Sequence, residues 1–182
     1  ALAGPRVVLL GASFDAYLAL RSLAHHPSNV VHAVALSGLA RCPEAMVDIF
    51  RATAEQLQAG PLTVAQLRAS FVTTTALPNE RDALGDSCLQ AMLEAVGHEQ
   101  ACLQLRMNVA LGEPSLAVAP YAHPTTIVHA RSDQIVPFGL AEELRGLGAN
   151  ARLVALDAGS HILPLTHSER LAALVAEVAS SA

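Results

Sequence analysis

The sequence contains no lysine, and only 3% of its 182 residues are aromatic. All 11 basic residues are arginines, which we attribute to genome composition rather than to chemistry. A formal net charge of -5 and a hydrophobic fraction of 52% describe a soluble globular protein and argue against nucleic acid or an anionic membrane as a partner. A small-molecule ligand fits this composition better, and the scarcity of aromatic residues disfavours a pocket walled by aromatic rings.

Cysteine is scarce as well. The three cysteines, Cys42, Cys88 and Cys102, are odd in number and lack Cys-x-x-Cys spacing. This pattern indicates neither a disulfide framework nor a cysteine zinc site, so we expect buried free thiols and no metal.

Most histidines lack the spacing with carboxylates or cysteines that would hold a metal ion. We therefore interpret these residues as structural or surface histidines: His25, His26, His32, His98, His123, His129 and His167.

Long apolar runs are also absent. No run reaches the roughly 18 residues that a membrane-spanning helix needs, and the first residues lack the positively charged start of a signal peptide. We therefore expect a soluble, cytoplasmic protein with no membrane partner. The length of 182 residues suits one domain with a sizeable core.

The start of the chain reads as a strand, a helix and a second strand. Residues 6–10 are a short run of valine and leucine closed by Gly11, which is typical of a strand buried on both faces of a parallel sheet. Apolar residues then recur at helical spacing over residues 14–25, and residues 30–36 predict the next strand, ended by Ser37. These elements predict a βαβ unit with Gly11 at the carboxyl end of its first strand, where open α/β sheets place their sites.

Residues 39–122 change character and read as helices without convincing strands. One helix is predicted to begin near residues 43–44, and a capping box at Thr63 and Gln66 is predicted to open another. A longer helical pattern covers residues 83–111.

The sheet pattern returns in residues 123–182. Strands are predicted over residues 125–130 and 151–156, with a helix over residues 139–147 between them. A second capping box, at residues 166–169, is predicted to open the last helix.

Three polar residues each follow the carboxyl end of a predicted strand: Ser13, Asp133 and His161. Loops of this kind converge at one edge of a parallel sheet. Serine is a poor nucleophile unless an imidazole takes its proton, and a carboxylate fixes the tautomer of that imidazole and stabilises its charged form. The three residues therefore predict a nucleophile, an orienting acid and a general base. Taken singly, Ser13 is equally well explained as a helix N-cap. Asp133 as a turn residue and His161 as a surface residue are weaker alternatives to their catalytic roles.

The motifs around these residues resemble those of the α/β-hydrolase superfamily. Residues 11–15, Gly-Ala-Ser-Phe-Asp, resemble the nucleophile elbow, residues 124–137 resemble the strand and loop that carry the acid, and residues 159–164 resemble the histidine loop. The resemblance covers the carboxyl-terminal two thirds of such a protein. It implies an α/β fold with a parallel sheet, flanking helices and a helical cap. It also implies a serine hydrolase that cleaves a carboxylic ester or thioester, with the Phe14 N–H donating to the oxyanion.

The same resemblance divides the chain into three segments. Residues 1–38 would hold part of the core sheet with the elbow, residues 39–122 would form the helical cap insertion, and residues 123–182 would hold the rest of the core with the acid and histidine loops. No metal or organic cofactor is implied. The low aromatic content favours an aliphatic acyl group, and some leucine and methionine side chains of the cap would line its pocket.

Two departures from the family pattern bear on function. Asp15 stands where the elbow normally has a second glycine. The aspartate is tolerated if its side chain points outward; otherwise it indicates a weakened site or a contact with a polar group of the substrate. The strands that normally precede the elbow, and the loop that donates the second oxyanion N–H, do not occur in this sequence. Because natural proteins avoid unprotected sheet edges, we expect a preceding segment of a longer chain, or a second polypeptide, to complete the sheet.

Two further functions remain open on the same residues. An acyltransferase would pass the acyl group from Ser13 to an alcohol, amine or thiol instead of water. A non-catalytic ligand-binding module would keep the pocket as a sensor, which Asp15 and the missing oxyanion loop would favour.

Overall fold

The structure, a computed structural model, divides into two compact units. It describes residues 6–23, 29–58, 60–61, 63–72, 75–81 and 84–181. The sheet unit comprises Ala1–Ala40 with Val118–Ala182, and the helical unit comprises Arg41–Ala117. The helical unit therefore falls inside the predicted insertion of residues 39–122.

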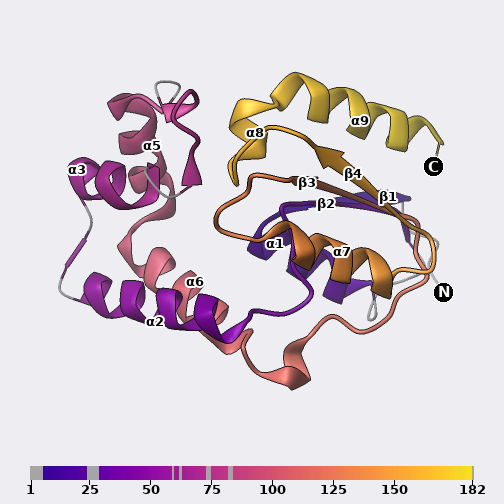
Figure 1. The fold of residues 1–182 in the computed structure, drawn as a ribbon, viewed down its shortest axis with the longest axis horizontal. Helices are drawn as coiled ribbons and strands as arrows, with labels where there is room; N and C mark the ends of the chain where they lie inside the picture. The colour runs from indigo at the N-terminus through magenta and orange to yellow at the C-terminus, as the bar shows by residue number, and fades with distance from the viewer. Residues whose placement is uncertain are drawn as a thin grey trace. The chain divides into compact units, whose positions relative to one another are not determined.

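Within the described residues, the sheet unit contains four parallel strands in the order β1-β2-β3-β4 (Figure 1). Their bounds are Val7–Ala12 for β1, Val30–Leu36 for β2, Thr125–Ala130 for β3 and Ala151–Leu156 for β4. The last three strands were predicted with these bounds. β1 runs past Gly11 to Ala12, because both residues stay in register with β2. The predicted α/β fold with a parallel sheet is confirmed.

Helices cover both faces of this sheet (Figure 1). α1 (Phe14–Ser22) and α7 (Phe138–Leu147) lie on one face, and the short α8 (Leu163–Thr166) and α9 (Ser168–Ser181) lie on the other. The core beneath α9 is apolar because side chains of β2, β3 and β4 alternate toward it and meet one stripe of the helix. This core includes Val34, Leu36, Val128, Leu156, Leu171 and Val178.

The end of the chain corrects one prediction. Thr166 does not open the last helix, because it is the final residue of α8 and α9 begins at Ser168. The Thr166 hydroxyl is engaged instead by the Ile162 carbonyl, at 3.4 Å, and by Nδ1 of His167, at 2.8 Å. At the other end of the chain, the predicted helix end at His25, with His26, lies outside the described residues.

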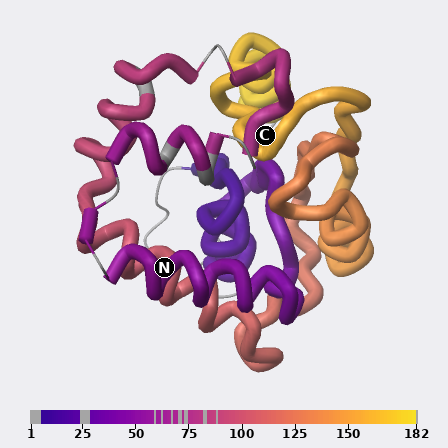
Figure 2. Tube along the Cα trace, turned by 60° about the vertical axis from the view of Figure 1, so that its left-hand side comes forward, coloured from indigo at the N-terminus to yellow at the C-terminus, as the bar shows by residue number. Residues whose placement is uncertain are grey.

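The helical unit is built from α2 (Glu44–Gln58), α3 (Val64–Leu67), α5 (Asp86–Val96) and α6 (His98–Ala110). A π-helical turn at Arg68–Val72 follows α3, and a 3-10 turn at Pro114–Leu116 follows α6. α2 and α6 lie side by side (Figure 2).

Two predictions for the helical unit have different outcomes. The capping box is confirmed, because the Gln66 N–H donates to the Thr63 hydroxyl while the Gln66 side chain accepts from the Thr63 N–H. The prediction of one continuous helix over residues 83–111 is wrong, because the structure has two helices there. Gly97 adopts φ 71°, a left-handed conformation that ends α5 and starts α6. Residue 83 itself lies outside the described residues.

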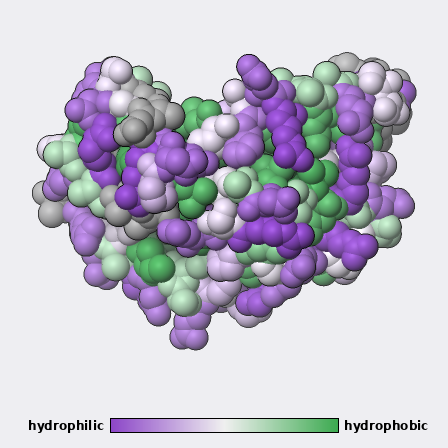
Figure 3. Space-filling view, turned by 45° about the horizontal axis from the view of Figure 1, so that its top comes forward, coloured by the Kyte–Doolittle hydropathy of each residue, from purple (hydrophilic) through white to green (hydrophobic). Residues whose placement is uncertain are grey.

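Across the part of the chain that the structure describes, no helix combines the length and the hydropathy needed to cross a bilayer. On the face shown in Figure 3, hydrophilic residues repeatedly interrupt the hydrophobic ones.

Candidate active site

Ser13 occupies a strained turn between β1 and α1. Its backbone has φ 55° and ψ -117°, a conformation that side-chain-bearing residues rarely adopt. The Ser13 N–H donates to the Leu36 carbonyl at 2.8 Å, which ties the turn to the end of β2. Strand and helix approach so closely here that a Cβ on Gly11 would lie 2.3 Å from the Asp15 carbonyl oxygen. Gly11 therefore has to be glycine for this turn to form.

The hydroxyl of Ser13 does not cap the helix that it precedes. Ser13 stands at the N-cap position of α1, and its carbonyl accepts from the Ala16 N–H at 3.1 Å. Its side chain makes no capping hydrogen bond and lies 2.9 Å from Nε2 of His161. The side chain therefore faces the imidazole that the nucleophile interpretation requires.

His161 links Ser13 to Asp133. Its Nδ1 lies 2.9 Å from Oδ2 of Asp133. Because an ionised carboxylate only accepts hydrogen bonds, Nδ1 carries the hydrogen and donates it, so Nε2 is free to accept the Ser13 hydroxyl hydrogen. The loops after β1, β3 and β4 thus bring the three predicted residues into one hydrogen-bonded series.

Asp133 is held as a charged, buried group. Its side chain is fully buried, and its Oδ1 accepts from the Ile135 and Val136 N–H groups, each at 2.9 Å. Burial acts to raise the pKa of Asp133, but hydrogen bonding and electrostatic attraction from His161, together with the Val136 N–H, outweigh it. The pKa of this carboxyl therefore lies below its usual range.

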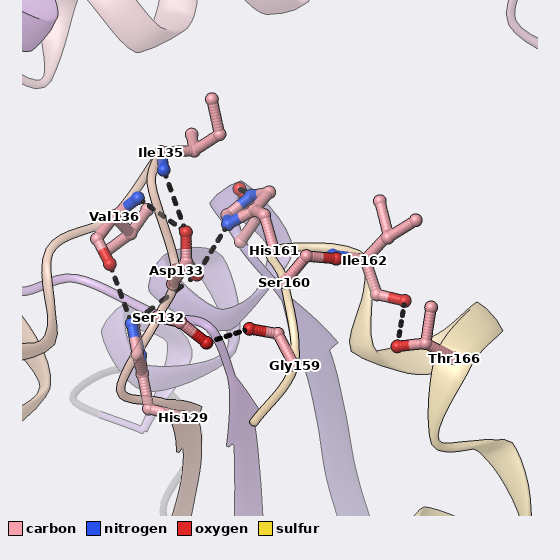
Figure 4. A network of polar contacts seen from close by, with 11 residues as sticks. His129, Ser132, Asp133, Ile135, Val136, Gly159, Ser160, His161, Ile162 and Thr166 are labelled. Carbon is pink, nitrogen blue, oxygen red and sulfur yellow. Dashed lines mark hydrogen bonds and ion pairs between the residues drawn. The ribbon is translucent and has the colours of Figure 1, made fainter. Parts of the chain in front are cut away.

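A side-chain bond joins the acid loop to the histidine loop. The Ser132 hydroxyl donates to the Gly159 carbonyl at 2.7 Å (Figure 4). Gly159 has φ 136°, and a Cβ there would lie 2.9 Å from the His167 ring. Residue 159 therefore has to be glycine, because a side chain would strain this backbone conformation and collide with His167.

Phe14, whose N–H is the predicted oxyanion donor, is the first residue of α1. Among the described residues, none accepts a hydrogen bond from the Phe14 N–H, which is one of the unpaired donors that begin any helix. Asp15 is exposed in the same turn. This is the outward placement in which an aspartate is tolerated beside the elbow, and a carboxylate is favourable near a helix N-terminus.

Two residues near the site carried no functional signal in the sequence. His129 is fully buried beside Asp133, although sequence reasoning gave it only a structural or surface role. Ser37 directly follows β2 with φ 47°, and its buried hydroxyl has no partner among the described residues. The sequence held no signal that distinguishes either residue from a purely structural one.

The prediction that the cysteines are buried free thiols is confirmed only in part. Cys42 is buried, whereas Cys102 is partly exposed; the side chain of Cys88 lies outside what the structure describes. No group of three or more His, Cys, Asp or Glu side chains in the described part of the chain is placed to hold a metal ion.

No protein-family model matches the sequence. The structure is similar to that of an enol-lactonase from Burkholderia xenovorans LB400, with a TM-score of 0.77 and 16% identity, over 96% of this chain and 66% of that one. An esterase from Thermogutta terrifontis gives a TM-score of 0.74 at 16% identity, over 97% of this chain and 65% of the esterase. An alpha/beta hydrolase enzyme from a Medee basin deep-sea metagenome library gives 0.74 at 18% identity, over 96% and 65%. The chain thus spans about two thirds of the length of each of these proteins. It has the α/β-hydrolase fold.

Proposed function

We propose that this chain carries the catalytic residues of a serine hydrolase that cleaves a carboxylic ester or thioester. The observation that supports this most directly is the series of hydrogen bonds from Ser13 through His161 to Asp133, on a strained elbow. An esterase and an enol-lactonase are among the proteins of similar structure. These names support the class of reaction and leave the acyl and leaving groups open.

In the acylation step, Ser13 Oγ attacks the carbonyl carbon while His161 Nε2 takes the hydroxyl proton. Asp133 stabilises the resulting imidazolium through Nδ1. The tetrahedral intermediate then collapses, the bond to the leaving oxygen or sulfur breaks, and His161 returns the proton to that atom. An alcohol or thiol departs, and the acyl group remains on Ser13.

In the deacylation step, His161 takes a proton from water, and the oxygen of that water attacks the acyl carbonyl. The second intermediate collapses to release a carboxylic acid, and Ser13 Oγ recovers its proton from His161. The Phe14 N–H supplies one donor to the oxyanion in both steps.

We also propose that a strand from outside these residues pairs with β1 and brings a second oxyanion donor. Among the described residues, β1 has β2 as its one neighbour in the sheet, and Leu10 on β1 is 55% exposed. A groove of about 590 Å³, lined by β1 and α9, runs along this edge. The greater length of the structurally similar proteins supports a preceding segment as the source of that strand.

The helical unit is proposed to act as a cap over the substrate. The insertion leaves the sheet unit shortly after the carboxyl end of β2, which is the edge that carries Ser13. Its two ends meet, because the Val118 N–H donates to the Ala40 carbonyl at 2.8 Å. Because both ends of the insertion are anchored at one place, its sequence and length can vary without disturbing the sheet. A segment that determines substrate specificity requires this freedom.

A fluorophosphonate labelling experiment tests the serine hydrolase. The intact mass of the purified protein is measured before and after exposure, alongside Ser13→Ala and Ser180→Ala. Ser180 is exposed on α9, so its replacement is a matched control. We expect one adduct on the wild type and on Ser180→Ala, and none on Ser13→Ala.

The masses also test the proposed completion of the sheet. An untreated mass above 18.9 kDa, or a second co-purifying chain, supports a strand supplied from outside these residues. A complete, folded protein that forms no adduct contradicts the hydrolase and favours a ligand-binding module.

A further inference from the structure

His129 lies behind the acid of the proposed triad, on β3. It is 0% exposed, and its Nε2 lies 2.8 Å from the Val136 carbonyl oxygen and 3.5 Å from Oδ2 of Asp133. Its other ring nitrogen, Nδ1, is buried and has no hydrogen-bond partner among the described residues. Figure 4 shows Asp133 between the rings of His161 and His129. The carboxylate is therefore flanked by two imidazoles, of which only one reaches Ser13.

The contacts of His129 fix its tautomer. A carbonyl oxygen only accepts hydrogen bonds, so the nitrogen beside Val136 must carry the hydrogen. A second hydrogen on Nδ1 would be buried without an acceptor, which costs free energy. The ring is therefore neutral, with its hydrogen on Nε2.

The combined effect of burial and of the neighbouring groups on the pKa of His129 also favours a neutral ring. Burial lowers the pKa of His129 most; the Val136 carbonyl and Asp133 oppose this, and His161 adds to it, so the pKa lies below its usual value. Phe138 of α7 packs edge-on against the His129 ring. The Arg131 guanidinium lies over the Phe138 ring, 4.6 Å from its centre.

The hydrogen bond from His129 holds the peptide segment that binds Asp133. Val136 uses its N–H to bind Oδ1 of Asp133 and its carbonyl to bind His129. Val136 is therefore held at its N–H by Asp133 and at its carbonyl by the buried His129 ring. Because a neutral His129 ring does not compensate the negative charge of Asp133, that charge remains available to stabilise His161, the imidazole that becomes charged during acylation.

We propose that His129 is a positioning residue of the triad, which as a neutral Nε2–H imidazole clamps the Val136 carbonyl and keeps Asp133 aligned with His161. This inference rests on the proposed function, because the alignment matters for catalysis only if Ser13 is the nucleophile. His129 acts through Asp133 and does not touch the reacting atoms.

Paired substitutions test the positioning role. His129→Leu removes the donor, and His129→Gln keeps an N–H that reaches the Val136 carbonyl. We expect kcat for a p-nitrophenyl ester to fall by about 10- to 100-fold in His129→Leu, with KM nearly unchanged, and to recover largely in His129→Gln. The acidic limb of the kcat/KM profile should move to lower pH in His129→Leu, because a loosened Asp133 stabilises the His161 imidazolium less.

A second histidine of the sheet serves as the control. His32 on β2 is part-buried and pairs with the Thr126 hydroxyl at 2.9 Å. His32→Leu and His32→Gln should leave kcat and the acidic limb unchanged. Equal losses of kcat in His129→Leu and His129→Gln, or a loss without a change in the pH profile, would overturn the positioning role.

The tautomer is tested separately from activity, by nitrogen NMR of the histidine rings in the wild-type protein. We expect the His129 ring to carry its hydrogen on Nε2 alone and to stay neutral as the pH falls from neutral through the ordinary histidine pKa of about 6.5. A hydrogen on Nδ1, or titration near that value, refutes the inference even if His129→Leu fails to fold. A fixed Nε2–H tautomer in a protein without esterase activity would instead show that the proposed function is wrong while the clamp exists.

Discussion

Burial governs the charge of His129, and this single residue makes stability depend on pH. Loss of hydration is the main cause that lowers the pKa of its ring in the folded chain. The unfolded chain binds a proton there below about pH 6.5, whereas the folded chain binds it only at lower pH. The free energy of unfolding therefore decreases as the pH falls from 6.5 toward the lowered pKa.

Replacing His129 by glutamine should flatten this pH dependence. Between about pH 6.5 and pH 5, we expect the slope of the unfolding free energy to decrease by up to about 1.4 kcal/mol per pH unit. Urea unfolding at several pH values measures the slope. His98→Gln, at an exposed position on α6, is the matched control and should keep the wild-type slope. An unchanged slope in His129→Gln would contradict a buried, neutral ring.

The two described free cysteines should differ in reactivity. Cys42 is 4% exposed, and burial raises the pKa of its thiol to about 11. Cys102 is partly exposed on α6, with its sulfur 3.8 Å from Nε2 of His98. Because the thiolate is the reactive form, iodoacetamide should modify Cys102 well before Cys42 in the folded protein. Peptide mass spectrometry over time measures both sites; equal rates would contradict the burial of Cys42, and Cys102→Ser should remove the fast modification.

At the scale of elements, the junction of β1 and α1 depends on one glycine. Alanine at Gly11 would place its Cβ against the Asp15 backbone, which cannot move without shifting the helix. We expect Gly11→Ala to lower the free energy of unfolding by more than about 2 kcal/mol and to slow fluorophosphonate labelling of Ser13.

Another glycine gives the matched control for this substitution. Gly146 lies exposed in α7, and a Cβ there would meet no atom within 4 Å. Gly146→Ala should stabilise the protein by about 0.5–1 kcal/mol, because alanine favours helix, and should leave labelling unchanged. Urea unfolding and the labelling rate measure both variants. If Gly11→Ala unfolds and labels like the wild type, the strand and helix do not approach as closely as described.

Strands were more predictable than helix ends, for a physical reason. β3 is a buried run rich in threonine, valine and isoleucine, and local sequence alone limits where such a run starts and stops. Thr63 and Thr166 begin the same kind of local motif, yet only Thr63 caps a helix. The hydroxyl of Thr166 is bound by groups of α8 and His167, whose positions depend on the packing of the chain.

For the whole molecule, parallel topology is what brings the site together. Ser13 and His161 are far apart in the sequence, and their loops meet because every strand of the sheet points the same way. Sequence order and residue type were therefore enough to predict which three side chains meet. The clamp at His129 was not predictable, because its partner is a backbone carbonyl that only the folded acid loop brings to the ring.

The open edge of the sheet leads to a prediction about association. Within the described residues, β1 pairs on one side only, and its Leu10 side chain is 55% exposed. Unpaired N–H and C=O groups beside an exposed leucine form a template for another strand. We expect residues 1–182, expressed alone, to self-associate through this edge, and Leu10→Lys to raise the dissociation constant at least about tenfold, which corresponds to about 1.4 kcal/mol.

Sedimentation velocity over a range of concentrations measures this association. Leu165→Lys is the matched control, because Leu165 is also an exposed leucine, at 51%, but lies on α8 rather than on the edge strand. It should associate like the wild type. If both lysine variants weaken association equally, general hydrophobicity and not the strand edge is responsible. If the wild-type chain is monomeric at every concentration, the edge of β1 is not available to a second strand, and the proposed completion of the sheet from outside loses its main physical support.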